Sequence, residues 1–163
     1  MSYSACRANC LDASALVKIH IYEDGSDILR AYLKQEATKY TTPFCFYEAL
    51  GVLKTMWQYR KTISEAQYLD ASFGLAAWYC AATVRIKDID LASPLTFDAV
   101  KRLVEKTSLD LSDAFQILSV KSGYFSSSIG DSSTVLVTGD KKLAAAARVE
   151  GLHAWYFMEE PAP

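Results

Sequence analysis

The sequence predicts an α/β domain built on a parallel sheet. Along the 163 residues, segments with a strand-like pattern alternate with segments of helical periodicity, and the chain contains no internal repeat. Residues 134–138, Thr-Val-Leu-Val-Thr, form an uninterrupted β-branched and apolar run, which is typical of a strand covered by helices on both faces. No linker-like stretch divides the chain, so one domain is expected over residues 1–163.

The first strand is predicted to end at Leu11, because a short apolar entry stops there before Asp12. Small residues follow, and an amphipathic run through Ile28, Leu29 and Leu33 then predicts one first helix that finishes in charged sequence. Ligands of open parallel sheets bind beyond the carboxyl ends of the strands. Asp12 is therefore expected to lie where a ligand would bind.

A second strand is expected at residues 40–42, followed by two helices at residues 44–60 and 64–82. Thr42 can cap the first of these helices through its hydroxyl, since threonine is a favoured residue just before a helix. That helix is apolar over most of its circumference, which predicts that it is mostly buried with Glu48 in its middle.

Residues 84–91 alternate apolar and charged side chains and are assigned as a third strand. A short helix is predicted at residues 97–105, and another begins at Asp110 or Ser112, either of which can cap it. A loop rich in serine and glycine, residues 126–133, leads into the fourth strand.

The carboxyl-terminal part of the chain repeats the alternation of strand and helix. The strand at residues 134–138 is followed by an alanine-rich helix at residues 141–150, which Gly151 ends in the position where glycine is favoured. A last strand is predicted at residues 153–157, and the tail, residues 159–163, is expected to be frayed.

The composition is that of an ordinary globular protein, with 51% hydrophobic and 22% charged residues. The net charge of −2 supplies no global basic field, so any contact with nucleic acid would depend on a local patch of lysine and arginine. The sequence contains neither an apolar run long enough to span a membrane nor the apolar core of a signal peptide, and a cytoplasmic location is expected. The four cysteines lack metal-ligand spacing and are interpreted as reduced thiols, with Cys45 and Cys80 buried.

Four carboxylates stand at related places in the predicted elements. Asp12 follows the first strand, Glu48 lies on the helix after the second, Asp113 opens the helix before the fourth strand, and Asp140 follows that strand. If the first and fourth strands are neighbours, all four acids can converge at one edge of the sheet. Carboxylates so close together repel one another and need protons or a divalent cation. Oxygen ligands favour Mg²⁺ or Mn²⁺, and such sites usually serve displacement at a phosphate.

Each acid also has a structural interpretation. Asp140 can cap the helix that follows it, Asp113 is favoured in a first turn by the helix dipole, and Asp12 can accept from backbone amides at a tight turn. Asp110 is interpreted as a helix cap, although it could join the site. Glu48 has no lysine or arginine three or four residues away, so its partner must come from elsewhere in the fold.

Four short motifs follow one another in an order and spacing that are specific in combination. They are Leu11-Asp12-Ala13-Ser14-Ala15-Leu16, then Glu48, then Ser112-Asp113-Ala114, and finally Val137-Thr138-Gly139-Asp140-Lys141-Lys142-Leu143. This series resembles PIN-domain proteins, and in style it is most similar to the VapC toxins of prokaryotic toxin–antitoxin pairs. The resemblance covers about residues 9–157.

The resemblance implies a PIN-like fold, with a five-stranded parallel sheet flanked by helices on both faces. It also implies an endoribonuclease that depends on Mg²⁺ or Mn²⁺, with RNA as substrate, an antitoxin protein as partner and a homodimer as the assembly. The catalytic, metal-binding acids would then be Asp12, Glu48, Asp113 and Asp140. The supporting hydroxyls would be those of Ser14 and Thr138, and Lys141 and Lys142, beside the acids, are candidate phosphate contacts.

Three other functions are weighed against this one. A stand-alone RNA-processing nuclease fits the extra sequence at residues 87–107, which is long for a minimal toxin of this type. A receiver-like signalling module would need paired acids early in the chain and a phospho-acceptor after the third strand, where only Asp88 and Asp90 are available. A PIN fold used only for binding would not need its full set of acids.

Overall fold

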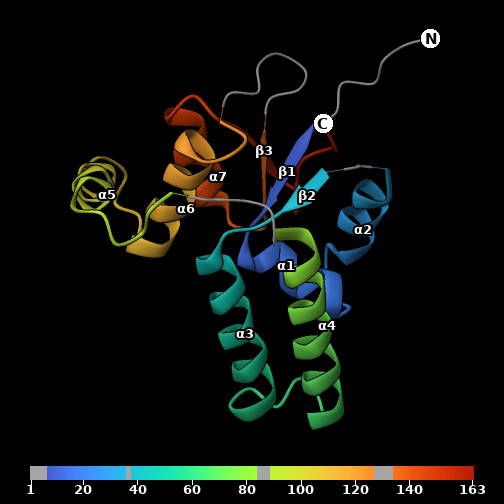
Figure 1. Ribbon diagram of the computed structural model, residues 1–163. Helices are drawn as coiled ribbons and strands as arrows, with labels where there is room; N and C mark the ends of the chain where they lie inside the picture. The colour runs from blue at the N-terminus through green and yellow to red at the C-terminus, as the bar shows by residue number, and fades with distance from the viewer. Residues whose placement is uncertain (1–6, 36–37, 84–88, 127–133) are drawn as a thin grey trace.

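A computed structural model describes residues 7–35, 38–83, 89–126 and 134–163 of the chain (Figure 1). Within these residues, four parallel strands form one sheet in the order β2-β1-β3-β4, and seven helices surround it. The α/β class and the parallel sheet predicted from the sequence are confirmed. In chain order the elements are β1 (Ala8–Leu11), α1 (Ala13–His20), α2 (Ser26–Gln35), β2 (Thr38–Tyr40), α3 (Pro43–Gln58), α4 (Glu65–Thr83), α5 (Pro94–Thr107), α6 (Leu111–Ser122), β3 (Val135–Thr138), α7 (Lys141–Val149) and β4 (His153–Tyr156).

The predicted neighbours β1 and β3 are paired at the centre of the sheet. Cys10 lies between Tyr40 of β2 and Leu136 of β3, and β3 pairs in turn with β4. The pairing continues past the strand ends, because the Asp12 N–H donates to the Val137 carbonyl over 3.2 Å. Since all four strands are parallel, their carboxyl ends meet at one edge, and residues 12 and 139 follow neighbouring strands there.

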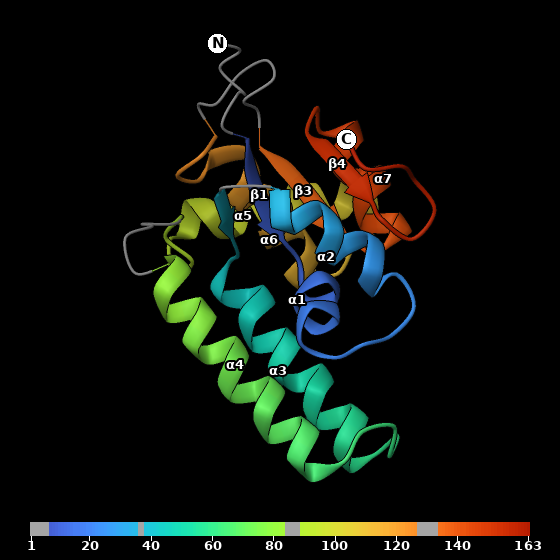
Figure 2. The same cartoon turned by 90° about the vertical axis from the view of Figure 1, so that its right-hand side faces the viewer.

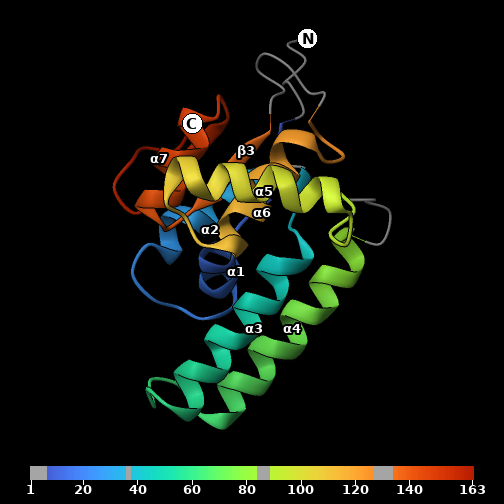
Figure 3. The same cartoon turned by 90° about the vertical axis from the view of Figure 1, so that its left-hand side faces the viewer.

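The two faces of the sheet bury separate hydrophobic cores, and the central strands contribute to both. On β1, Cys10 packs with the core formed by α5, α6 and α7, whereas the next residue, Leu11, packs with the core formed by α1 to α4. On β3, Leu136 and Val137 divide in the same way, and both are fully buried. Figures 2 and 3 show these helix layers from the two sides. A strand buried on both faces is mostly apolar, as the sequence of β3 indicates, and the buried polar side chains of Asn9 and Thr138 form hydrogen bonds.

Helices α3 and α4 form a hairpin that projects beyond the carboxyl edge of the sheet (Figure 1). The hydroxyl of Thr42 caps α3 as predicted, accepting from the Cys45 N–H over 3.2 Å. Ser64 and Gln67 cap α4 reciprocally, each side chain accepting from the other residue's backbone N–H. The prediction that the first of these helices is mostly buried is wrong for one side of it, where Tyr47 is 71% exposed and Glu48 is also exposed, because α3 packs on α1 and α4 along its other side.

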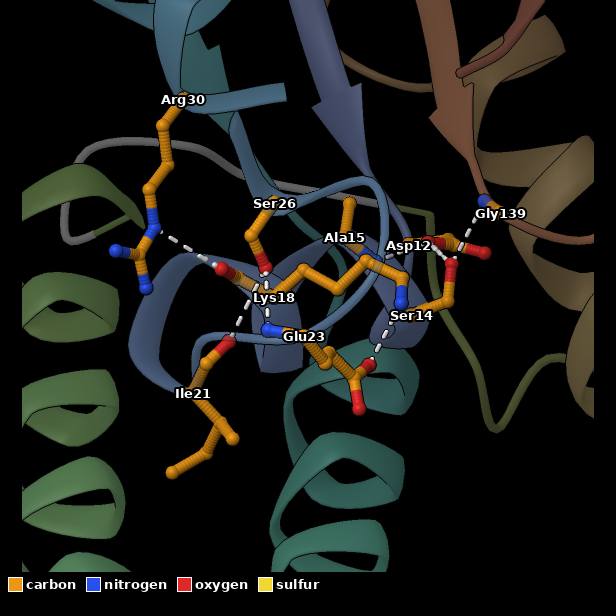
Figure 4. A network of polar contacts seen from close by, with 9 residues as sticks. All are labelled: Asp12, Ser14, Ala15, Lys18, Ile21, Glu23, Ser26, Arg30 and Gly139. Carbon is orange, nitrogen blue, oxygen red and sulfur yellow. Dashed lines mark hydrogen bonds and ion pairs between the residues drawn. The ribbon is translucent and has the colours of Figure 1, made fainter. Parts of the chain in front are cut away.

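The single first helix predicted from the amphipathic run is two helices, α1 and α2. Where α1 ends, the Ser26 hydroxyl accepts from the Glu23 N–H over 3.0 Å and donates to the Ile21 carbonyl over 3.3 Å (Figure 4). Gly25 adopts φ +83°, a left-handed conformation that suits glycine. A turn with its own hydrogen bonds therefore interrupts a run whose apolar periodicity is continuous.

The sheet of the described residues has four strands where five were expected. Part of the predicted strand at residues 84–91 lies outside the described residues. The rest of it is not a strand: Asp90 begins a turn, its carboxylate accepting from the Ala92 N–H over 3.0 Å and its carbonyl from the Ser93 N–H over 3.2 Å. This turn leads into α5, which begins at Pro94, earlier than the sequence predicts.

The carboxyl-terminal tail is held against the domain, so the prediction of fraying is wrong for its first residues. Glu160 pairs with Arg148 and accepts from the Tyr156 N–H, while its carbonyl accepts from the Trp155 indole over 3.1 Å. Cys80 is exposed, contrary to expectation, because it does not lie on the side of α4 that buries Ala71 and Leu75. No helix in the described part of the chain is long and apolar enough to cross a membrane.

We expect Gly25→Ala to destabilise the protein by about 1–2 kcal/mol, because an L-residue is strained at this φ. An added Cβ would also lie 2.7 Å from the Met158 sulfur. Gly51→Ala is the matched control: nothing lies within 4 Å of an added Cβ in the middle of α3, so the exchange should stabilise by about 0.5–1 kcal/mol. Thermal unfolding followed by circular dichroism measures both, and a Gly25→Ala midpoint at or above that of the wild type would contradict this account.

Candidate active site

A cavity of about 390 Å³ lies beyond the carboxyl ends of β1 and β3. Its lining includes all four acids singled out in the sequence, Asp12, Glu48, Asp113 and Asp140. They come from the start of α1, the body of α3, the start of α6 and the start of α7, so the tertiary fold brings together four distant parts of the chain. A larger cavity of about 560 Å³ beside the connection between α1 and α2 is lined by none of them.

Asp12 is the most deeply buried of the four acids, at 4% exposed. Its carboxylate accepts three hydrogen bonds: from the Ala15 N–H (2.8 Å), the Ser14 hydroxyl (2.7 Å) and the Thr138 hydroxyl (2.5 Å). Burial raises the pKa of Asp12, and these hydrogen bonds oppose that rise. The residue therefore caps α1, as the structural interpretation has it, and also lines the cavity.

The hydroxyls of Ser14 and Thr138 connect the segments that follow β1 and β3. Both hydroxyls donate to Asp12, and each also accepts a backbone hydrogen bond from the turn after β3: the Gly139 N–H donates to Ser14 over 2.7 Å and the Asp140 N–H to Thr138 over 2.9 Å. Figure 4 shows Ser14 between Asp12 and Gly139. A Cβ at Gly139 would lie 3.0 Å from both the Ser14 hydroxyl and the Phe157 ring, so glycine permits this close approach.

Asp140 caps α7 and also lines the cavity. One of its carboxylate oxygens accepts from the backbone N–H groups of Lys142 (2.7 Å) and Leu143 (3.1 Å), which fixes its position. The side chains predicted to contact phosphate lie outside the cavity lining. Lys141 forms an ion pair with Glu159 over 2.9 Å, and Lys142 lines a different cavity, which includes none of the four acids.

Glu48 and Asp113 are the acids whose carboxylates make no hydrogen bond to the described residues. Burial, together with the charges of Asp110 and Asp140, raises the pKa of Asp113 to about 7. Burial also raises the pKa of Glu48, with Asp12 as the next contributor. Asp110 caps α6 by accepting from the Asp113 N–H over 2.9 Å, and it acts on the site through its charge.

The cavity contains one ion pair that the sequence did not single out. The Lys18 ammonium lies 2.7 Å from a Glu23 carboxylate oxygen, and the Lys18 side chain is only 12% exposed (Figure 4). Gln116 also lines the cavity. Helical spacing could have indicated two of these residues, because Lys18 lies four residues after Ser14 and Gln116 three residues after Asp113. Glu23 had no such signal, since the turn that places it was not foreseen.

The donor set of the cavity suits a hard divalent cation, because carboxylate oxygens are the ligands that Mg²⁺ and Mn²⁺ prefer. In residues 7–35, 38–83, 89–126 and 134–163 as they are positioned, however, no three histidine, cysteine or acidic side chains form a group that could hold a metal ion. Asp12 and Asp140 are fixed by their hydrogen bonds. Binding an ion would therefore require the side chains of Glu48 and Asp113 to rotate toward them.

Comparison with known proteins adds no family assignment. The chain matches no protein-family model, and no curated protein matches it.

The raised pKa of Asp113 predicts a pH-dependent stability. A carboxyl whose pKa is about 7 in the folded protein and near 3.8 in the unfolded chain binds more protons when folded between those values. Its contribution to stability is therefore lost as the pH rises through that window, and Asp113→Asn should remove the contribution.

Urea unfolding of the wild type and Asp113→Asn at intervals between about pH 5 and about pH 8 measures this effect. We expect the variant to gain stability relative to the wild type as the pH rises. Asp98→Asn, an exposed acid on α5, is the matched control and should show no such gain. A difference between Asp113→Asn and the wild type that is independent of pH would refute the assignment.

Proposed function

We propose that this protein is a metal-dependent endoribonuclease with a PIN-like fold. The observation that carries the proposal is the convergence of Asp12, Glu48, Asp113 and Asp140 on one cavity beyond the carboxyl ends of two adjacent parallel strands. Perturbed carboxyl pKa values clustered in a cavity are typical of functional sites. The strand order β2-β1-β3-β4 is compatible with a PIN-like sheet.

Crowding of the four carboxylates supports a cation at this site. Three of the four have raised pKa values, and the charges of neighbouring acids contribute to each rise. The Lys18 ammonium does not neutralise the cluster, because Glu23 occupies it. A phosphodiester, itself an anion, would be repelled until positive charge enters the cavity.

The four acids would hold one or more Mg²⁺ or Mn²⁺ ions. When bound, such an ion activates a water molecule as nucleophile and stabilises the developing charge on the phosphate oxygens. The chain's own contribution is the placement of the ligands. Ser14 and Thr138 hold the Asp12 carboxylate at the strand ends, and the first turn of α7 holds Asp140. Glu48 and Asp113 remain free to adjust.

Within this class we propose the toxin of a toxin–antitoxin pair, with RNA as substrate, an antitoxin as protein partner and a homodimer as the assembly. The resemblance of the motifs around the four acids supports the toxin assignment. A stand-alone RNA-processing nuclease would use the same site, and growth arrest on expression distinguishes the two, because only a toxin should halt growth through its active site.

Cleavage of total cellular RNA tests the enzymatic proposal. We expect purified protein to produce discrete fragments with Mg²⁺ or Mn²⁺ and none with EDTA. Glu48→Gln and Asp113→Asn should each reduce the rate roughly 100-fold or more, because loss of even an outer partner of a metal ligand costs about 10–100-fold. Asp98→Asn should cleave like the wild type. Cleavage that persists in EDTA, or in both site variants, would refute the proposal.

Metal binding should also stabilise the fold. We expect saturating Mg²⁺ or Mn²⁺ to raise the thermal midpoint of the wild type, since a ligand present at about 100 times its dissociation constant stabilises by about 2.7 kcal/mol. The shift should be smaller in Asp113→Asn, which loses a ligand. Differential scanning fluorimetry over a metal titration measures both, and equal shifts in the two proteins would place the ion elsewhere.

A further inference from the structure

One wall of the acid cavity contains a buried amide with no partner. Gln116 lies in α6, is 2% exposed and contributes to the cavity lining. Its amide nitrogen is buried and makes no hydrogen bond to any described residue. A buried donor without a partner costs free energy, and native proteins retain few of them.

The surroundings of Gln116 indicate what it could bind. Most of the other polar side chains of the cavity wall are carboxylates, which can only accept hydrogen bonds when ionised. The Ser14 hydroxyl donates to Asp12 and the Lys18 ammonium pairs with Glu23. Gln116 thus offers an unused donor, and it is placed one turn after Asp113 on the same side of α6.

From these contacts we infer that Gln116 binds a phosphate oxygen of the RNA strand in the acid cavity. The inference rests on the proposed ribonuclease function and extends it to a further substrate-binding residue. A phosphodiester brings acceptor oxygens and no donor in its phosphate group, so it complements an amide N–H. Because an amide is neutral, Gln116 can approach the phosphate without competing with the cation for the carboxylates.

A second buried group on the same helix provides a control. Ser119 is also 2% exposed and its hydroxyl also lacks a partner, but it does not line the cavity. Replacing either polar group with an apolar one should remove the free-energy cost of a buried polar atom that lacks a hydrogen-bond partner. Only the loss of the Gln116 amide should weaken the binding of the RNA substrate. Comparing variants of the two residues therefore distinguishes a binding role of Gln116 from a structural one.

The experiment compares Gln116→Met, which keeps the length of the side chain, with Ser119→Ala. The probe is a fluorescein-labelled oligoribonucleotide spanning a site that the wild type cleaves in total RNA. We expect Gln116→Met to raise KM or lower kcat/KM about tenfold or more, as expected for a lost hydrogen bond to a charged group, with an unchanged or higher thermal midpoint. Ser119→Ala should retain wild-type kinetics.

A direct readout does not depend on the variant folding. The side-chain amide resonances of Gln116 in the wild-type protein should shift when the same oligonucleotide, with a phosphorothioate at the cleaved linkage, is added with Mg²⁺. Wild-type kinetics in Gln116→Met, or amide resonances that do not move while others in the cavity do, would overturn the inference and leave the nuclease intact. A wild type that neither binds nor cleaves RNA would instead overturn the proposed function, and this inference with it.

Discussion

The hydrogen bonds that hold the Asp12 carboxylate are the interaction on which the rest of the site depends. Asp12 follows β1 and Thr138 ends β3, 126 positions apart, yet the Thr138 hydroxyl donates to the carboxylate over 2.5 Å. Ser14 completes the connection by donating to Asp12 and accepting from Gly139. These bonds fix the starts of α1 and α7 relative to each other. They also keep a buried carboxylate satisfied, which would otherwise be costly in an apolar core.

The same edge of the sheet also brings together carboxylates whose charges repel one another, and this repulsion opposes the stabilisation from the hydrogen bonds. Asp113 and Glu48 line the cavity from α6 and α3, and the pKa of each is raised by burial and by neighbouring acids. The protein therefore maintains a cluster that weakens the fold until protons or a cation neutralise it. Such conflict between stability and local charge is expected at functional sites. The unpaired amide of Gln116 has the same character, since it costs stability in the free protein.

The periodicity of apolar residues along the sequence predicted those helices and strands in which each face is either buried or exposed along its whole length. It failed where turn chemistry or exposure decided the outcome. The Ser26 hydroxyl and the left-handed Gly25 divide one amphipathic run into two helices, although the apolar spacing alone favours continuity. Asp90 uses its side chain to form a turn where alternation suggested a strand. In both places a short polar side chain satisfies backbone groups locally, and periodicity contains no information about such bonds.

The sequence by itself determined the parallel α/β class and the four acids, because strand burial and residue type are local properties of the chain. The apolar run of β3 requires helices on both faces, and Asp12 and Asp140 lie one and two residues after strands that are paired in the sheet. Only the tertiary structure decided which further groups meet those acids. Glu23 enters the cavity through the turn after α1. Lys18 and Gln116 lie one turn after Ser14 and Asp113 on α1 and α6, and the placement of these helices at one cavity depends on packing between segments far apart in the sequence.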